Sequence, residues 1–185
     1  MSRSPAPTLT GVERMFNEGE VIVTKTDLKG RITYANDIFQ RASAVTERQA
    51  LGQPHNFIRH PDMPRSIFNL MWETISAGQE LFAYVVNRAM NGDHYWVYAH
   101  VTPSFNEAGE IIGYHSNRRE PDRRIIEKEV KPLYANLREV EASAGSPKQA
   151  LAAGREAISA FLAERQVEYD EFICTLGQGQ RRGYR

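Results

Sequence analysis

The chain has 185 residues, a length that suits one ordinary domain with an added element. Hydrophobic residues make up 41% and charged residues 25%, which is typical of a globular protein and excludes a disordered or fibrous chain. The 23 Lys and Arg balance 23 Asp and Glu, so the chain has no net positive charge to attract the phosphates of a nucleic acid. Nucleic acid is therefore not expected as a partner.

No membrane-spanning or secretory segment is expected. The longest uninterrupted apolar run, Leu81–Val86, is far below the roughly 20 residues that a membrane-spanning helix requires. The stretch Met1–Gly11 is polar and contains prolines, unlike the apolar core of a signal peptide. The single cysteine, Cys174, excludes an intramolecular disulfide and a cysteine-based zinc site. We therefore expect a cytoplasmic protein without direct membrane insertion.

The N-terminal part, residues 1–19, is expected to form a lead or cap. Within it, Leu9–Phe16 has the pattern of a short amphipathic helix with Thr10 as its cap. Two alternating segments follow, Glu20–Thr26 and Arg31–Ala35, separated by a turn that ends in glycine. They predict a β-hairpin.

The middle of the chain is predicted to be helical. Asn36–Ala44 has helical spacing, and Thr46 opens a second short helix as half of a capping box with Gln49. His55–Met63 has no periodicity and is expected to be irregular. Apolar residues then recur at helical intervals over Pro64–Ala77 until a glycine ends the helix.

Three strand-like segments complete the central part of the chain: Leu81–Ala89, Asp93–Pro103 and Glu110–Arg119. An Asn-Gly dipeptide, a strong hairpin signal, joins the first two. Two strands, a helical insertion and three strands predict an α+β domain over residues 20–120, with a five-stranded antiparallel sheet and short helices on one face.

The tail, residues 121–185, is predicted to be a helical hairpin that serves in signalling or dimerisation. Its apolar residues first step by four and three, the heptad spacing of a helix that packs on another helix. These residues are Ile126, Val130, Leu133, Leu137 and Val140. A Gly-Ser-Pro break separates them from a second helical stretch with a similar spacing. A homodimer through the sensor domain and these helices is expected.

Alternation along two neighbouring strands predicts a lined cavity, because every second side chain points to the same face. The two rows are Leu81, Ala83, Val85 and Asn87, and Tyr95, Val97, Ala99 and Val101. Asn87 is the polar exception, and a buried amide needs hydrogen-bond partners. Either it binds a ligand, or it caps the loop that follows. Trp96 falls on the opposite face and is expected to pack outside the sheet.

Several motifs in this order resemble the PAS sensor domain, and more closely the PAS domain of bacterial aerotaxis receptors. They are Thr26-Asp27-Leu28, Ile32-Thr33-Tyr34-Ala35-Asn36-Asp37, Gly52-Gln53-Pro54-His55-Asn56, Arg59-His60-Pro61-Asp62-Met63-Pro64, Asn87-Arg88, Asn91-Gly92-Asp93-His94-Tyr95-Trp96-Val97 and Gly113-Tyr114. The resemblance covers about Val23 to Arg118 and implies the PAS fold.

The resemblance also implies a function. Receptors of this family bind FAD non-covalently and report the redox state of the electron-transport chain to a chemotaxis signalling module. Most of them carry membrane, HAMP and methyl-accepting segments, which this sequence does not show. We therefore expect the PAS-only half of a bipartite energy-taxis sensor, acting on a separate membrane transducer or chemotaxis signalling protein.

The family pattern implies cofactor contacts at Asn36, Arg59, His60, Asp62 and Asn87. Asn87 is expected to bond the polar edge of the isoalloxazine ring. A guanidinium at Arg59 offers a two-pronged donor for the cofactor's phosphates. In the alternative interpretation Arg59 and Asp62 form a surface ion pair, or Asp62 caps the following helix.

Asn117 in the last strand is a further expected contact. It alternates with His115 onto one face of the strand. If that face looks inward, Asn117 occupies the place of the glutamine that relays the flavin state in light-sensing PAS domains, and its amide can exchange donor for acceptor. Otherwise the face is partly solvated and its polarity is incidental.

Other functions compete with the flavin interpretation. A haem b sensor requires an axial imidazole, for which His60 and His115 are the candidates. A metal site from His55, His60 and Asp62 has suitable ligand types. Light-driven cysteine chemistry is excluded, because residues 55–60 contain no cysteine. No G-x-S-x-G, Walker or kinase motif is present, so no enzyme is expected. A ligand-free dimerisation module stays open.

Overall fold

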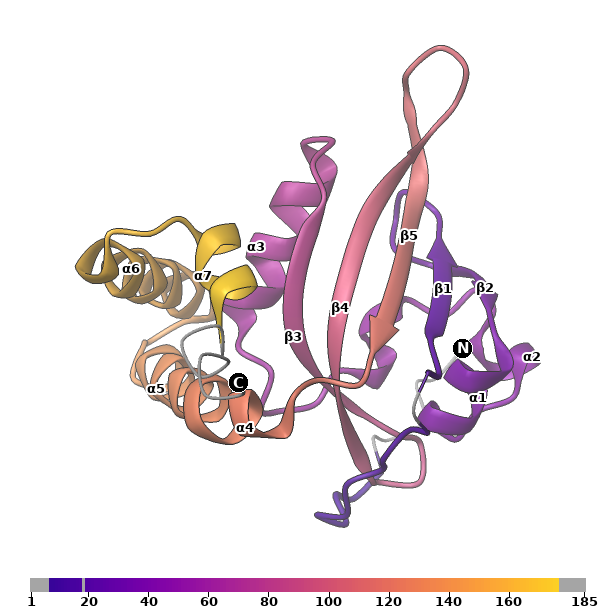
Figure 1. The fold of residues 1–185 in the computed structure, drawn as a ribbon, viewed down its shortest axis with the longest axis horizontal. Coiled ribbons are helices and arrows are strands. Elements are labelled where there is room, and N and C mark those ends of the chain that lie inside the picture. The colour runs from indigo at the N-terminus through magenta and orange to yellow at the C-terminus, as the bar shows by residue number, and fades with distance from the viewer. Residues whose placement is uncertain (1–6, 18, 177–185) are drawn as a thin grey trace, which may run out of the picture.

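The computed structural model describes residues 7–17 and 19–176. Its centre is a five-stranded antiparallel sheet in the order β2-β1-β5-β4-β3 (Figure 1). The strands are β1 (Ile22–Thr26), β2 (Ile32–Ala35), β3 (Leu81–Arg88), β4 (His94–Phe105) and β5 (Ile111–Arg119). The predicted five-stranded α+β fold is confirmed.

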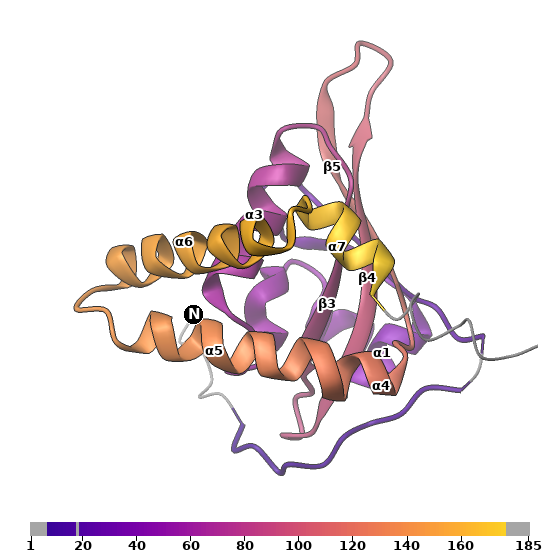
Figure 2. The ribbon, with the colours of Figure 1, turned by 60° about the vertical axis from the view of Figure 1, so that its left-hand side comes forward.

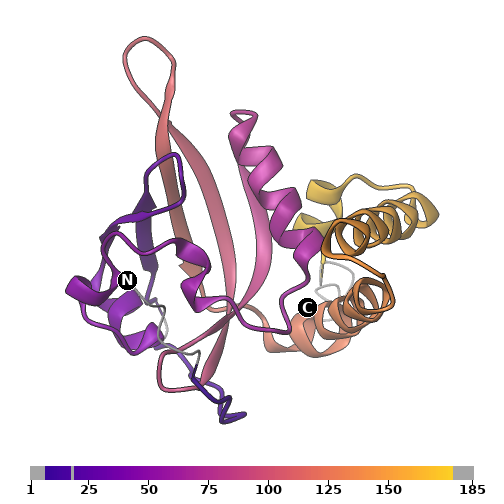
Figure 3. The same cartoon turned by 180° about the vertical axis from the view of Figure 1, so that it is seen from behind.

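Four short helical segments connect β2 to β3 and lie on one face of the sheet, here called the inner face (Figure 3). They are α1 (Asp37–Ser43), α2 (Glu47–Ala50), the 3-10 turn η1 (His55–Ile58) and α3 (Arg65–Ser76). The capping box of Thr46 and Gln49 is present at the start of α2. Local capping therefore fixes where this helix begins.

The tail is helical and folds back on the domain. Its elements are α4 (Arg123–Ile125), the π-helical turn η2 (Ile126–Val130), α5 (Lys131–Ala142), α6 (Pro147–Arg165) and α7 (Tyr169–Thr175). Helices α5 and α6 lie side by side as a hairpin (Figure 2). None of the helices in the described ranges is long and apolar enough to cross a membrane.

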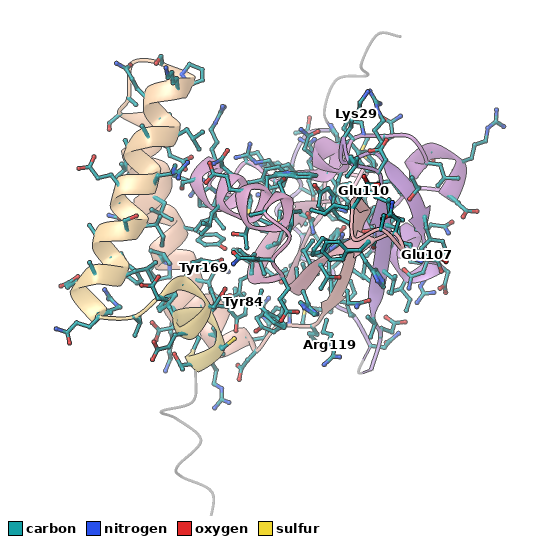
Figure 4. All side chains as sticks on the ribbon, turned by 90° about the horizontal axis from the view of Figure 1, so that it is seen from above. Lys29, Tyr84, Glu107, Glu110, Arg119 and Tyr169 are labelled. Atoms are coloured by element: carbon teal, nitrogen blue, oxygen red, sulfur yellow. The ribbon has the colours of Figure 1, made fainter. Side chains whose placement is uncertain are left out.

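The heptad stripe packs inside the same chain. Ile126 and Leu137 are fully buried. The Tyr134 hydroxyl donates to the carbonyl oxygen of Tyr84 at 2.5 Å, and its ring lies 6.0 Å from that of Trp96. The expected outward placement of Trp96 is confirmed. The tail thus covers the outer face of β3 and β4, and Tyr84 and Tyr169 mark this junction in Figure 4.

The prediction of a short helix over Leu9–Phe16 is wrong. This segment is extended, and its backbone hydrogen-bonds to Gly92 and His94 at the start of β4. The Thr10 hydroxyl donates to Asp93 at 2.7 Å and caps no helix. Tertiary hydrogen bonds therefore override the local amphipathic pattern. The predicted lead and tail also include residues 1–6, 18 and 177–185, which lie outside the described residues.

Candidate functional site

A cavity lies between α3 and the inner face of the sheet. It encloses about 670 Å³ of space free of atoms, part of it open to solvent. The cavity is lined by Thr24, Thr26, His55, Arg59, Met63, Phe68, Met71, Trp72, Ile75, Val85, Val86, Asn87, Ala99, Val101, Tyr114, His115, Ser116 and Arg118.

The alternation of the strands sets most of the sheet side of this cavity. Of the two predicted rows, Val85, Asn87, Ala99 and Val101 line it. Ser116 of β5 lies opposite Val101 of β4 and Thr24 of β1, so the polar lining continues across the sheet. The cavity wall is therefore apolar on β4 and polar on β1 and β5.

Trp72 of α3 forms part of the other wall. Its ring meets that of Tyr114 edge to face, with centroids 5.5 Å apart. Its far edge lies against Gly30, where an added Cβ would come within 2.6 Å of the indole. Gly30 also has a φ of +71°, which favours glycine. The β1–β2 turn thus holds Trp72 in place beside the cavity.

Arg59 and Asn87 lie together at the cavity. Their backbones form an isolated antiparallel bridge, and Asn87 is buried. The amide nitrogen Nδ2 of Asn87 has no hydrogen-bond partner. Arg59 donates from Nη2 to the carbonyl of Met63 at 2.8 Å and lies 5.5 Å from the ring centroid of Phe68, while its Nε has no partner. Both residues therefore keep unused donors.

Arg118 contributes a second buried guanidinium. Its Nη2 donates to Thr24 Oγ1 at 2.6 Å and lies 2.7 Å from His55 Nε2. Burial, and then the charge of Arg118, hold the pKa of His55 well below its ordinary value of 6.5, so this imidazole is neutral and accepts. Burial lowers the pKa of Arg118 to about 10, at which it stays charged at neutral pH.

The buried polar atoms without partners fit a flavin. Besides Asn87 Nδ2 and Arg59 Nε, they include Thr26 Oγ1, Ser116 Oγ and Arg118 Nη1. Buried polar groups in proteins are normally hydrogen-bonded, so these atoms are available to bind a ligand or ordered water in the cavity. A flavin ring offers carbonyl oxygens and ring nitrogens along one edge and an apolar surface elsewhere. The donors and the apolar walls are of the types that such a ring requires.

His60 and Asp62 lie outside this cavity. They border a second pocket together with His94, Trp96 and Arg138. Asp62 pairs with Arg138 of α5, and its backbone N–H donates to His60 Nδ1 at 3.1 Å. Neither alternative for Asp62 holds, because its partner is Arg138 and because a different residue, Glu141, caps α3. The candidate metal ligands also separate, since His55 faces the main cavity.

Asn36 and Asn117 do not line the cavity either. The Asn36 side chain accepts from the N–H groups of Phe39 and Val23 and donates to the carbonyl of Val21, so it caps α1 and fixes β1. Asn117 lies on the outer face of β5, because the inward positions of this strand belong to Ser116 and Arg118. The condition for its relay role, an inward face, is not met.

The sequence analysis singled out neither Arg118 nor Trp72 as a site residue. A signal for Arg118 existed: it shares a face of β5 with Tyr114 and Ser116. For Trp72, the signal is its helical spacing to Phe68 and Ile75, which favours a shared face of α3. Nothing in the pattern distinguished a packed face from one that borders a cavity.

Comparison with known proteins identifies the fold family. Residues 32–118 match the PAS fold family. The chain is 42% identical over 135 residues to the aerotaxis receptor of Escherichia coli (strain K12), covering 72% of this chain and 26% of the receptor. It is 31% identical over 106 residues to the nitrogen fixation regulatory protein of Klebsiella pneumoniae, covering 57% of this chain and 21% of that protein.

A solved structure has the same fold. It is a Light-Oxygen-Voltage domain studied with a flavin analogue, with a TM-score of 0.54 at 13% identity, covering 63% of this chain and 87% of the other. The chain spans 26% and 21% of the lengths of the two curated relatives, so the likeness concerns only part of each. The motifs, the sheet order and these matches agree. This chain carries a PAS domain of the aerotaxis receptor family.

Proposed function

We propose that this PAS domain is a redox or energy sensor that binds a flavin, specifically FAD, non-covalently in the main cavity. The observation that supports the proposal is the cluster of buried, unpartnered polar atoms on Arg59, Asn87, Ser116 and Arg118. When bound, the flavin supplies a group that accepts and returns electrons at its ring. No substrate turnover is proposed, because the role is signalling.

The chain's own residues would hold and shield the ring. Asn87 and Arg59 would donate to acceptor atoms of the cofactor, and each such bond relieves a desolvated donor. Met71, Trp72 and Val101 provide apolar surface that excludes water. A protein donor in this low-dielectric space interacts more strongly with a change of ligand charge than it would in water.

Helix α3 provides a route from the cavity to the tail. Its side chains Met71, Trp72 and Ile75 line the cavity, while its first turn is held by the carboxylate of Glu141 in α5. Glu141 accepts from the backbone N–H of Arg65 at 2.9 Å and from that of Ser66 at 2.8 Å. A carboxylate at a helix N-terminus also interacts favourably with the helix dipole.

A second contact ties the same turn of α3 to α6. Gly154 of α6 approaches Ser66 so closely that an added Cβ would lie 2.8 Å from the Ser66 side chain. Arg155 pairs with Glu73 at 2.5 Å. A shift of α3 on a change of ligand state would therefore alter the populations of positions that α5 and α6 adopt.

We propose that the tail helices pass this change to a separate membrane transducer or chemotaxis signalling protein in the cytoplasm. The relationship to the aerotaxis receptor supports a signalling partner. A homodimer is proposed as well. Since Ile126 and Leu137, the most buried residues of the heptad stripe, are covered by this chain itself, such a dimer would use other surfaces.

The visible spectrum of the purified protein tests the cofactor proposal. We expect the absorption envelope of an oxidised flavin, and FAD after heat release and chromatography. A Soret band would contradict it in favour of haem, for which His115 borders the cavity and His60 does not. Protein that stays colourless and shows no flavin binding after FAD addition would contradict it in favour of a ligand-free module.

Hydrogen exchange tests the route through α3. In the flavin-loaded protein, chemical reduction should change amide protection in α3 and in α5, and Glu141→Ala should remove the change in α5 only. Glu139→Ala, at an exposed position of the same helix, is the matched control. An unchanged response in Glu141→Ala would show that the signal takes another path.

A further inference from the structure

Arg118 is a buried charge in the middle of the sheet. Only 4% of its surface is exposed, and its strand pairs with β1 on one side and β4 on the other. One end of the guanidinium, Nη2, contacts Thr24 and His55. The other terminal nitrogen, Nη1, has no hydrogen-bond partner, and the residue lines the main cavity.

The groups around Arg118 do not neutralise it. Thr24 is neutral, and burial keeps His55 neutral by lowering its pKa. The guanidinium carbon lies 5.9 Å from the centroid of the Phe39 ring. Within residues 7–17 and 19–176, no carboxylate forms an ion pair with Arg118.

A buried charge without a counter-ion is among the least favourable arrangements in a protein. Its loss of hydration is offset only by pairing and hydrogen bonds, and an uncompensated ion destabilises the fold. Thr24 and His55 together satisfy one nitrogen of Arg118 and leave the charge uncompensated. The structure therefore indicates that something else completes this site in the working protein.

We propose that Arg118 is a ligand-binding residue, whose Nη1 donates to an oxygen-bearing acceptor or anionic group of the molecule in the cavity. This proposal rests on the flavin proposal above and deepens it. Thr24 and His55 act as positioning residues, because they hold Nη2 and so aim Nη1 at the cavity. A flavin has two groups of this chemistry, the carbonyl edge of its ring and, in FAD, its phosphates.

Flavin titration of purified, ligand-free protein tests the proposal. Arg118→Met should bind FAD about 10- to 100-fold more weakly than the wild type, the loss expected for a buried hydrogen bond to a charged group. Arg118→Lys should fall between the two, because it keeps the charge but loses the planar fork. Arg119→Met is the control, since Arg119 is exposed on the same strand (Figure 4).

Riboflavin, which lacks phosphates, separates the two sources of the acceptor. Equal weakening of riboflavin and FAD by Arg118→Met assigns Arg118 to the ring, and weakening of FAD alone assigns it to the phosphates. Both results support a ligand contact. Wild-type affinity for both molecules in Arg118→Met would overturn it. Failure of the wild type to bind any flavin would instead defeat the flavin proposal itself.

The melting temperature of the ligand-free protein excludes a purely structural role. Because Arg118→Met removes an uncompensated charge, its ligand-free melting temperature should equal or exceed that of the wild type. The increase on adding FAD should shrink at the same time. A ligand-free melting temperature well below the wild-type value would overturn the proposal, since the charge would then be holding the fold. Arg118→Lys provides the same comparison if Arg118→Met does not fold.

Discussion

Polar groups on the two faces of the sheet have different surroundings. On the inner face, Asn87, Ser116 and Arg118 border a cavity and keep donors or acceptors without partners. On the outer face, Tyr134 donates to the backbone of Tyr84 and packs beside a buried tryptophan. The inner face therefore offers polar atoms to a ligand, whereas the Tyr134 contact on the outer face is satisfied within the protein.

The Arg59–Asp62 motif connects the two faces. Arg59 points to the main cavity, whereas His60 and Asp62 border the second pocket beside the tail. Burial lowers the pKa of His60, which favours a neutral ring there. One short loop therefore reaches both the proposed ligand and helix α5. This arrangement makes the effects of substitutions on the two faces separable.

The largest expected effect is a loss of stability from a substitution in the tail. Leu137→Ala removes a fully buried side chain from the tail, and it should lower the free energy of unfolding by about 2–5 kcal/mol. Urea denaturation measures this change, and Leu133→Ala, at a half-buried position, should cost less. The folded variant should keep its flavin affinity. A loss of affinity as large as that of a cavity variant would contradict the separation of the two faces.

Substitutions at the cavity on the inner face should change flavin affinity. Asn87→Ala and Arg59→Ala should each weaken flavin binding about 10- to 100-fold, because each removes a buried donor that the ligand would use. Fluorescence titration measures the affinity, and circular dichroism checks the fold. The exposed Asn136→Ala is the control for Asn87→Ala. Full flavin retention in both cavity variants would remove these residues from the site.

Lowering the pH should reduce the stability of the fold through His55, which borders the cavity on the inner face. The pKa of His55 is lowered by burial and by Arg118, so below pH 6.5 the unfolded chain binds a proton that the folded chain does not. Stability from this group is complete above pH 6.5 and falls with decreasing pH, by at most about 1.4 kcal/mol per unit. Urea denaturation at pH 7.5 and pH 5.5 measures the free energy of unfolding at each pH. The difference between the two values should be smaller in His55→Gln than in the wild type. The same difference in His55→Gln and in the wild type would mean that His55 contributes nothing to the pH dependence of stability.

The smallest effect concerns the ion pair between Asp62 and Arg138. Both side chains are about half exposed, so solvent screens their attraction, and their coupling energy should be at most about 1 kcal/mol. A double-mutant cycle with Asp62→Ala and Arg138→Ala, read by urea denaturation, measures it. A coupling of several kcal/mol would show that this pair is a main link between loop and tail.

The sequence predicted much of this protein from local patterns. Alternation located all five strands, glycine and Asn-Gly turns located the hairpins, and the capping box of Thr46 and Gln49 located α2. The same patterns placed Asn87 in a lined row and Trp96 on the opposite face, as the structure shows. These features depend on neighbours in the chain, so the order of residues alone determines them.

Tertiary structure decided the rest. A period of two gives two rows per strand but not which row faces inward, and packing assigned the inward row of β5 to Ser116 and Arg118 in place of Asn117. Loop residues have no period, so only the folded chain separates Arg59 from Asp62. The extended lead likewise follows from hydrogen bonds to residues about 80 positions away. Long-range contacts, which no local pattern encodes, thus selected the residues that face the cavity.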